Sequence, residues 1–592
     1  PILKVTPAGI LEKCKWRTTI DGSSEKEGEH YHGSSHHAAP SQDSVRLWFA
    51  QEANVPIHER CGQADVSSAY NVAGVGFDAH GKPAKIFVRK TSWDHAVQIV
   101  RGDDGVTRAV IDWDWFKEYR DILIARVAAG KKVIPEIYQR YLNPTERLLT
   151  LAQNTYGRKA GGRVWQDHLH DLLISPPLNT VRTSTEAAWW HIRRKTTTIF
   201  PESARDGMPD GGGDIQVHTD DMLIRPNKMY EYVTKVLQEQ KGLKLTCSAA
   251  VDAHVGVKIV YGTDEEGQHT VTLLQDQSIE KMHTAFRGLL DEREQVRRTK
   301  VEIPMCPSFK PTDMHEVDVS DKSAVAEMKR WPYRQILGHV MWICMTHPEC
   351  WHASRVLARH SNHHTEYHRN GLLDCALFLI RVAKGWGIKY TGTWTNEYLV
   401  QHPEHWHRVC NKVGSGDASH NDDHATMLCT GGAGVIGNRG FITGFCHSLK
   451  WVSLSTLSSE IKVLTKLSGI VFALQQLEEE LEKPDMGPMT ICTDSRSCTQ
   501  VTADPGRHRI NLTHVDRDAM KVCEYVRRGR VVVRWIPTDE NWADIFTKPL
   551  AAEKFYQFWK QMCGYQRWEI PDGSTTAAGV RYFEFTHWDV ET

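Results

Sequence analysis

Residues 215–224 read Ile-Gln-Val-His-Thr-Asp-Asp-Met-Leu-Ile, and they carry the most informative pattern in the chain. Apolar residues lead into and out of the central His218-Thr219-Asp220-Asp221, which predicts two strands joined by a tight turn. Adjacent aspartates repel each other at a turn. Divalent cations bound between them and a third carboxylate would offset this repulsion and could serve phosphoryl transfer. An isolated aspartate pair more often lies in a solvated turn than in a metal site. A third acid elsewhere in the chain is needed to distinguish the two.

A candidate third acid, Asp65, lies upstream in the hexapeptide Asp-Val-Ser-Ser-Ala-Tyr, which ends at Tyr70. This segment resembles the first catalytic motif of reverse transcriptases, where the aspartate holds both metals and the aromatic ring lies under the nucleotide sugar. Residues 156–165 read Tyr-Gly-Arg-Lys-Ala-Gly-Gly-Arg-Val-Trp. They resemble the Tyr-Gly-Leu-Lys-Gln-Ala-Pro-Arg-Ala-Trp segment of copia-type LTR retrotransposons. The order and spacing of the three segments match the reverse transcriptase region of that family's Pol polyprotein.

The second half of the chain carries a separate acid on a predicted helix. Residues 454–460 open a pattern in which apolar residues recur at helical spacing through Leu474. Glu460 lies four residues before Leu464, so it falls on the apolar, inward stripe of this helix. A buried acid needs a cation or a hydrogen-bond partner. This position therefore predicts either a metal ligand or an acid with a buried hydrogen-bond partner.

Three more acids could converge with Glu460, and they are Asp417, Asp494 and Asp544. Asp494 ends an apolar run, and residues 543–550 read Ala-Asp-Ile-Phe-Thr-Lys-Pro-Leu, close to the signature of copia-type ribonuclease H domains. The order Asp, Glu, Asp, Asp also matches the ribonuclease H carboxylate set. In that family the set binds two Mg²⁺ and cuts the RNA strand of an RNA–DNA hybrid.

Resemblance to copia-type elements runs almost continuously from about residue 12 to residue 562. Residues 332–342 resemble the Tyr-Arg-x-x-Leu-Gly-x-Leu-Met-Tyr segment that links the two domains in such elements. Residues 346–349 are similar to its Thr-Arg-Pro-Asp, and residues 255–259 to its Leu-Gly-Ile-Glu-Ile. The resemblance implies an α+β multidomain fold: a right-hand polymerase with fingers, palm and thumb, a connection, and a ribonuclease H-like domain with a mixed sheet and flanking helices.

The length of 592 residues predicts several domains. We expect fingers and palm over 1–265, a thumb over 266–320, a connection over 321–405 and ribonuclease H over 406–550. Residues 551–592 begin as a helix and end in a tail of unknown role. With 40% hydrophobic and 24% charged residues and no long apolar run, the chain is expected to be globular, without a signal peptide or membrane span.

The 14 cysteines form no Cys-x-x-Cys pair, which favours reduced thiols and an intracellular protein. A net charge of −1 argues against a generic basic nucleic-acid binder. Basic residues at 507–509, 517 and 527–530 either touch hybrid phosphates or form a solvated helix face. Two histidine clusters, at 30–37 and 360–368, lack the cysteines of a zinc finger, and the second resembles a Thr-Glu-x-His segment common in the family.

The chain departs from the family at two motifs. His218 and Thr219 stand where most members have Tyr and Val, which adds a titratable ring and a hydroxyl group. Ala160 and Gly162 replace Gln and Pro in the second motif, which loosens the backbone. That segment normally lies against the templating base pair. These substitutions therefore put the fidelity and processivity of DNA synthesis in doubt more than the phosphoryl transfer itself.

The resemblance implies a metal-dependent enzyme with two active sites. Asp65, Asp220 and Asp221 would bind two Mg²⁺ for polymerisation, and the four downstream acids would bind two for ribonuclease H, with Mn²⁺ as a substitute. Tyr70 would act as a steric gate against a 2′-hydroxyl. The remaining predicted nucleotide contacts are Lys15, Arg17, Tyr156 and Gly157.

The expected partners are an RNA template, a DNA or tRNA primer, RNA–DNA hybrids and dNTPs. A second copy, or the gag and integrase proteins of the same element, would be further partners. The expected setting is a cytoplasmic virus-like particle or the nucleus, before DNA integration. The competing hypothesis is a catalytically impaired protein derived from such an element and retained as a nucleic-acid-binding factor.

Overall fold

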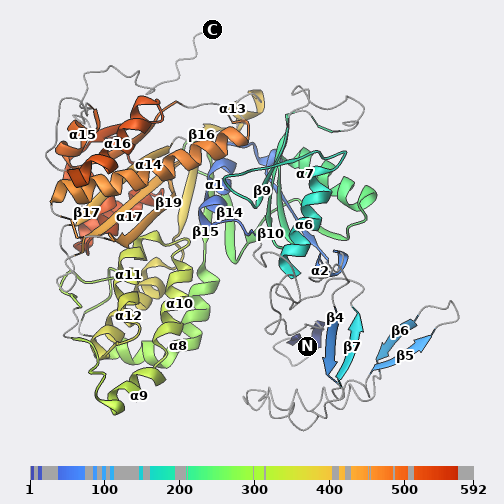
Figure 1. Cartoon of the computed structure of the whole chain (residues 1–592), viewed down its shortest axis with the longest axis horizontal. Coiled ribbons are helices and arrows are strands. Elements are labelled where there is room, and N and C mark those ends of the chain that lie inside the picture. The colour runs from blue at the N-terminus through green and yellow to red at the C-terminus, as the bar shows by residue number, and fades with distance from the viewer. Residues whose placement is uncertain are drawn as a thin grey trace. The chain divides into compact units, whose positions relative to one another are not determined.

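The fold is described from a computed structural model (Figure 1). The residues that the structure describes are 2–5, 11–15, 38–67, 69–73, 85–89, 97–101, 107–111, 146–150, 161–193, 208–209, 211–297, 299–311, 315–402, 412–419, 428–450, 452–453, 455–483, 487–503 and 513–570. The chain forms two compact units. The first comprises residues 1–37 and 67–172, and the second comprises residues 38–66 and 173–592. The predicted 1–265 segment is thus divided between both units.

The described part of the first unit contains three two-stranded antiparallel sheets. They pair β1 (Ile2–Val5) with β2 (Leu11–Lys15), β4 (Lys85–Arg89) with β7 (Glu146–Thr150), and β5 (Val97–Arg101) with β6 (Thr107–Ile111). Helix α2 (Ala69–Val72) follows the Asp65 strand, and α6 (Gly161–Ile174) begins in the predicted second motif. The side chains of Trp165, Leu169 and Leu173 recur at helical spacing on α6 and are buried.

A six-stranded sheet in the second unit carries the His-Thr-Asp-Asp hairpin. Its spatial order is β12 (Leu245–Ser248), β3 (Gly62–Val66), β11 (Asp221–Arg225), β10 (Gly213–His218), β9 (Trp189–Ile192) and β8 (Val181–Arg182). Every pairing is antiparallel. The predicted hairpin is confirmed, because β10 and β11 pair from Asp214↔Arg225 to His218↔Asp221 and leave only Thr219 and Asp220 in the turn.

Helices cover both faces of this sheet. Helix α7 (Asn227–Lys235) and its continuation η4 (Val236–Gln240) lie on one face, where Tyr230 and Met229 pack over Gly62 and Gly213. A Cβ at either glycine would overlap these side chains, so the sheet and helix approach closely only because the residue is glycine. Helix α1 (Gln42–Glu52) contacts the other face through the side chain of Gln216, which donates to Ser44 O.

A second sheet runs in the order β13 (Ala253–His254), β14 (Val257–Thr263), β15 (Gln268–Leu274) and β16 (Ile388–Thr395). The predicted boundary between palm and thumb at residues 265/266 falls inside the β14–β15 hairpin, and β15 pairs with β16 from the predicted connection. A helical region lies between β15 and β16 along the chain. Its helices are α8 (Asp276–Val296), α9 (Lys322–Arg330), α10 (Tyr333–Ile343), η6 (Pro348–Cys350), α11 (Trp351–Arg359), α12 (Glu366–Phe378) and η7 (Leu379–Ala383), and α13 (Asn396–Gln401) follows β16.

The C-terminal region has the mixed sheet that the sequence predicts. Strands β19 (Gly440–Ser448), β18 (Thr430–Gly437) and β17 (Lys412–Ser419) are antiparallel, and β20 (Met489–Thr493) and β21 (Val531–Trp535) continue the sheet in parallel. The predicted 437–440 turn joins β18 to β19, with Asn438 and Arg439 at φ of 49° and 68°. The helices are α14 (Thr456–Glu480), α15 (Arg496–Ala503), α16 (Thr513–Arg527), η9 (Thr538–Glu540), η10 (Trp542–Phe546) and α17 (Ala552–Met562).

Glycines in β18 let the two layers around this sheet approach closely. Gly431 faces Val463 of α14, whereas the next residue, Gly432, faces Phe546 of η10. Successive side chains on a strand point to opposite faces. Helix α14 therefore covers one face and η10 with α17 the other, as Figure 1 shows for α14. Among the described residues, no helix is both long and apolar enough to span a membrane.

Candidate active sites

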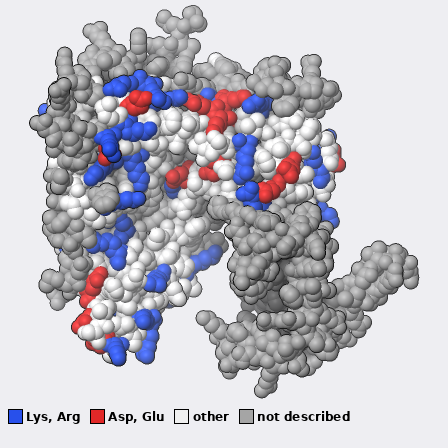
Figure 2. Space-filling view, in the orientation of Figure 1, with Lys and Arg blue, Asp and Glu red and all other residues white. Residues whose placement is uncertain are grey.

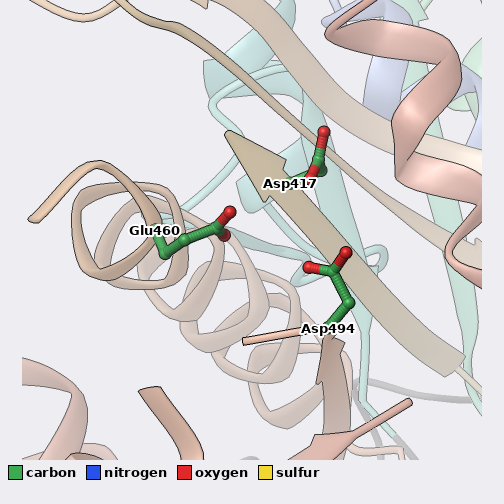
Figure 3. A group of neighbouring side chains, drawn as sticks. All are labelled: Asp417, Glu460 and Asp494. Carbon is green, nitrogen blue, oxygen red and sulfur yellow. The ribbon is translucent and has the colours of Figure 1, made fainter. Parts of the chain in front are cut away.

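Three of the predicted acids come together in the C-terminal region (Figure 3). Asp417 lies on the central strand β17, Glu460 in the first turns of α14, and Asp494 directly after β20. One ligand oxygen from each lies within 4.8 Å of the others. Within the described part of the chain, no other group of at least three His, Cys, Asp or Glu side chains meets this limit. The parallel register of β17 and β20 brings the two aspartates to the same end of the sheet.

The helix that carries Glu460 forms as its sequence pattern predicts. Ser455 caps α14 by accepting a hydrogen bond from Ser458 N. Glu460 shares the inward stripe with Leu464 and Leu467, and only 4% of its surface is exposed. Its Oε1 accepts a 3.3 Å hydrogen bond from Ala418 N, but its buried Oε2 has no hydrogen-bond partner. A buried carboxylate oxygen without a donor is costly unless a cation binds it.

Burial and mutual repulsion make these acids harder to ionise. Burial raises the pKa of Asp417 to about 6, and the neighbouring Asp544 carboxylate adds to the rise. Burial and the charges of Asp417 and Asp494 raise the pKa of Glu460 well above its usual value. Burial and Asp417 also raise the pKa of Asp494. A divalent cation would relieve this repulsion, so the donor set fits Mg²⁺.

The fourth predicted acid, Asp544, lies beside the three but has other partners. It is fully buried on η10, with Lys548 Nζ 2.8 Å from its Oδ1 and Lys554 Nζ 3.4 Å from its Oδ2. The hydroxyl of Thr547, three residues after Asp544, donates to Asp417 Oδ2. The signature segment therefore brings an acid, a hydroxyl group and one ammonium group to the site, and α17 adds a second ammonium group. A metal-ligand role for Asp544 stays a prediction.

The hairpin aspartates form a more open arrangement. Asp221 on β11 is directly opposite Asp65 on β3, so the two side chains lie on the same face of the sheet. Asp220 lies in the turn, and its carbonyl oxygen accepts a 2.9 Å hydrogen bond from Val66 N. Thr219 has a φ of 61°, a left-handed conformation that is unfavourable for a β-branched residue. Such strain is common at functional sites.

Two residues that the sequence did not single out hold Asp221. Gln63 Nε2 lies 2.8 Å from both of its carboxylate oxygens, and His254 Nδ1 lies 3.2 Å from Oδ2. Gln63 is two residues before Asp65 on the same strand, so its face was predictable. Burial and the charge of His254 lower the pKa of His218, which keeps this ring neutral at neutral pH. The ligand oxygens of Asp65, Asp220 and Asp221 do not all lie within 4.8 Å of one another. Joint metal binding by these three aspartates stays a prediction.

Several predicted nucleotide contacts cannot be placed at the site. Arg17, Tyr156 and Gly157 lie outside the described residues, while Lys15 ends β2 and Tyr70 lies on α2, both described through their backbone. The histidine cluster at 30–37 is likewise outside the described residues. In the second cluster, His368 and Thr365 form a capping box at the start of α12, and His360 bonds Glu316. These contacts account for His360 and His368 without a metal ion.

The basic residues at 517 and 527–530, on α16 and just after it, are exposed or partly exposed, which agrees with either prediction for them. Arg517 and Arg527 are exposed, whereas Arg528 pairs with Glu524 and Arg530 with Glu479. In Figure 2, Lys and Arg side chains gather at the upper left, where Figure 1 places α14 and α16. The cluster at 507–509 lies outside the described residues.

Solved structures of a ribonuclease H1 and of viral protease-reverse transcriptases are similar to parts of this chain. No protein-family model matches the chain. Ribonuclease H1 from the halophilic archaeon Halobacterium salinarum NRC-1 matches over 23% of this chain and 93% of its own, at 11% identity and a TM-score of 0.19. A foamy viral protease-reverse transcriptase in complex with an RNA/DNA hybrid matches over 85% of this chain and 46% of its own, at 10% identity and a TM-score of 0.33.

A mutant of the prototype foamy virus protease-reverse transcriptase matches over 90% of this chain and 48% of its own, at 11% identity and a TM-score of 0.18. The chain therefore spans about half the length of the two viral chains. These neighbours are nucleic-acid-processing enzymes.

Proposed function

We propose that the chain is the reverse transcriptase and ribonuclease H region of a copia-type retrotransposon. It would make DNA on RNA and DNA templates and degrade the RNA strand of RNA–DNA hybrids. The observation that carries the proposal is the convergence of Asp417, Glu460 and Asp494, with one Glu460 oxygen buried and unpartnered. The resemblance of residues 543–550 and the order of the acids support a ribonuclease H role for them, and separate motifs at 65–70, 156–165 and 218–221 support a polymerase role for the hairpin aspartates.

At the nuclease site, the protein fixes its carboxylates before the substrate binds. The Ala418 amide orients Glu460, and the Thr547 hydroxyl orients Asp417. Asp544 lies beside Asp417 and would complete the set, with its charge balanced by Lys548 and Lys554. Bound Mg²⁺, two ions per site with Mn²⁺ as a substitute, would supply activation of the attacking oxygen and neutralisation of charge on the leaving oxygen.

At the polymerase site, Asp65 and Asp221 face the same side of the sheet and Asp220 stands at the hairpin tip. Together they would hold the metals that position the primer 3′-hydroxyl and the dNTP phosphates. Tyr70 would exclude a 2′-hydroxyl, and Lys15, Arg17, Tyr156 and Gly157 would contact the nucleotide or template. His254 and Gln63 would keep the Asp221 carboxylate oriented until the substrate arrives.

The partners follow from this chemistry. The nucleic-acid partners would be an RNA template, a DNA or tRNA primer and the RNA–DNA hybrid that synthesis creates. Assembly with a second copy, or with gag or integrase of the same element, would place the protein in a cytoplasmic virus-like particle or the nucleus before DNA integration.

Incorporation of a labelled deoxynucleotide on a primed RNA template tests the proposal. The proposal expects Mg²⁺-dependent extension that EDTA stops. A folded protein that binds the primed template without extending it, and leaves a hybrid uncut, would instead be an element-derived nucleic-acid-binding protein.

A further inference from the structure

The base of the β10–β11 hairpin holds a buried group of charges. Asp214 and Arg225 are directly opposite each other, four or more residues from the Asp220-Asp221 tip, and Arg225 Nε donates a 2.9 Å hydrogen bond to Asp214 Oδ2. Both side chains are almost completely buried. Arg225 also donates to Gln51 Oε1 at 2.6 Å and lies over the Trp48 ring. The pair therefore joins the two strands of the hairpin to α1.

The end of α14 reaches this buried pair. Lys483, three residues beyond the helix, donates a 3.0 Å hydrogen bond to Asp214 Oδ2, and its side chain is only 9% exposed. The preceding Glu482 lies 3.3 Å from His191 Nε2, and His191 Nδ1 lies 2.9 Å from Asp214 Oδ1. Burial alone would raise the pKa of Asp214, but the charges of Lys483 and Arg225 hold it well below its usual value. Asp214 is thus an anion that binds both Arg225 of the hairpin and Lys483 at the end of α14.

Other side chains at the same helix end strengthen this contact. Glu480 accepts a 3.0 Å hydrogen bond from Ser184 N in the β8–β9 connection, and Gln51 of α1 lies 3.5 Å from Glu478. From the β19 side, Arg46 of α1 donates to Ile442 O at 2.6 Å. The polymerase sheet and the predicted ribonuclease H domain are therefore joined through polar contacts, of which those made by Gln51 and Arg46 are buried.

We infer that Lys483 is a positioning residue through which α14 holds the hairpin that presents Asp220 and Asp221. Helix α14 has 25 residues, which corresponds to about 37 Å. Glu460 of the nuclease site lies near its start, and Lys483 lies beyond its end. One stiff element thus connects the nuclease acids to the base of the polymerase hairpin. Loss of the Lys483 contact would let β10 and β11 move relative to α14.

This inference rests on the proposed polymerase function for its effect on rate, but not for its effect on hairpin motion. The test uses the full chain with Lys483→Met, which keeps much of the side-chain length and removes the charge. Asp214 retains Arg225 and His191 as partners, so the variant is expected to fold. Lys483→Arg restores the charge. The matched control is Glu479→Gln, at the same helix end, because Glu479 pairs with Arg530 of the C-terminal region.

Hydrogen exchange of the amides in residues 213–225 is the first measurement. We expect exchange to rise about tenfold in Lys483→Met, to return towards the parental rate in Lys483→Arg, and to be unchanged in Glu479→Gln. Strands β17 and β20 should keep their parental protection and so separate a local effect from general destabilisation. Parental exchange of the hairpin in folded Lys483→Met would overturn the inference. Faster exchange throughout the chain would overturn it as well, because Lys483 would then be a general stability residue.

Primer extension is the second measurement. The expected result is a fall in kcat of about tenfold to 100-fold for Lys483→Met, with KM for dNTP near the parental value and recovery in Lys483→Arg. Cleavage of a preformed hybrid should stay near the parental rate. If the parental chain extends no primer, the proposed polymerase function fails, and the exchange experiment still decides whether Lys483 holds the hairpin. If the parent extends primers and kcat is unchanged in the variant, Lys483 is not a positioning residue.

Discussion

The two predicted active sites differ in how completely the protein assembles them. Asp417 and Glu460 are buried, converge with Asp494 and have raised pKa values. Asp65 is exposed and Asp221 is half-buried, with its oxygens bonded to Gln63 and His254. The proposed nuclease site is a buried cluster of mutually repelling acids, whereas the ligand oxygens of the three proposed polymerase aspartates do not all lie within 4.8 Å of one another. If the proposed function is correct, substrate binding would contribute more to assembly of the polymerase site than to assembly of the nuclease site.

The elements that carry the acids explain this difference. Asp417 comes from the central strand of a sheet covered on both faces, and Glu460 comes from the helix that packs on that strand. Asp220 instead lies in a two-residue turn at the end of its sheet. A packed strand and helix fix side chains more tightly than a turn does.

The largest expected effect is on polymerisation in Asp220→Asn. The substitution removes a charge at the hairpin tip, so primer extension should fall about 10³-fold while hybrid cleavage stays near the parental rate. Both activities are measured on the same preparation, with circular dichroism as the control for folding. Equal loss of both activities in a folded variant would contradict the separation of the two sites.

Glu460→Gln is the reciprocal change. Hybrid cleavage should fall about 100-fold, with DNA synthesis near the parental rate, because a ligand charge is lost while shape and hydrogen bonding persist. Removing one of the repelling acids should also raise the melting temperature of the metal-free protein. Cleavage at the parental rate would show that Glu460 is not a ligand.

The stability of the metal-free protein as a function of pH tests whether the fold holds the nuclease acids close together. The pKa of Asp417 rises from 3.8 to about 6 on folding, so its favourable contribution is complete below about pH 4 and is lost as pH rises through about 6. This rise corresponds to about 3 kcal/mol. Relative to Asp417→Asn, the parental chain should lose stability between pH 4 and 7, and Mg²⁺ should remove this loss. Parallel denaturation profiles for the two proteins without metal would argue against the raised pKa.

The smallest expected effect is on sugar selection by Tyr70→Val. Removing the ring should open space for a 2′-hydroxyl and increase ribonucleotide use relative to dNTP by about tenfold. Competition between dNTP and rNTP at a single template position measures the ratio. Unchanged discrimination would make Tyr70 a packing residue and leave the polymerase site without its predicted gate.

Local patterns predicted the positions of the acids better than their partners. The spacing of Glu460 and Leu464 was enough to place that acid inward, and the apolar flanks of Asp220 and Asp221 were enough to predict the hairpin. The contact of His254 with Asp221 joins residues 33 apart, for which no periodicity gives a signal. The pairing of β15 with β16 crosses a predicted domain boundary, and it likewise joins residues too far apart in the chain for a periodic pattern to predict.

Asp544 illustrates a second limit of the sequence patterns. Its signature segment places it beside Asp417, yet the same segment and α17 supply the lysines that bind its carboxylate. Whether an acid meets a cationic side chain or another acid depends on tertiary packing. The link from Lys483 to Asp214 joins residues 269 apart and was also absent from the sequence patterns.

The most direct test of two separate metal-dependent sites is one reaction that reports on both. A labelled RNA template is annealed to a DNA primer with a second label and incubated with dNTPs and Mg²⁺. We expect primer lengthening and RNA shortening, both stopped by EDTA, with Asp220→Asn losing only primer lengthening and Glu460→Gln losing only RNA shortening. Absence of both activities in a folded parental chain that binds the primed template would contradict the account.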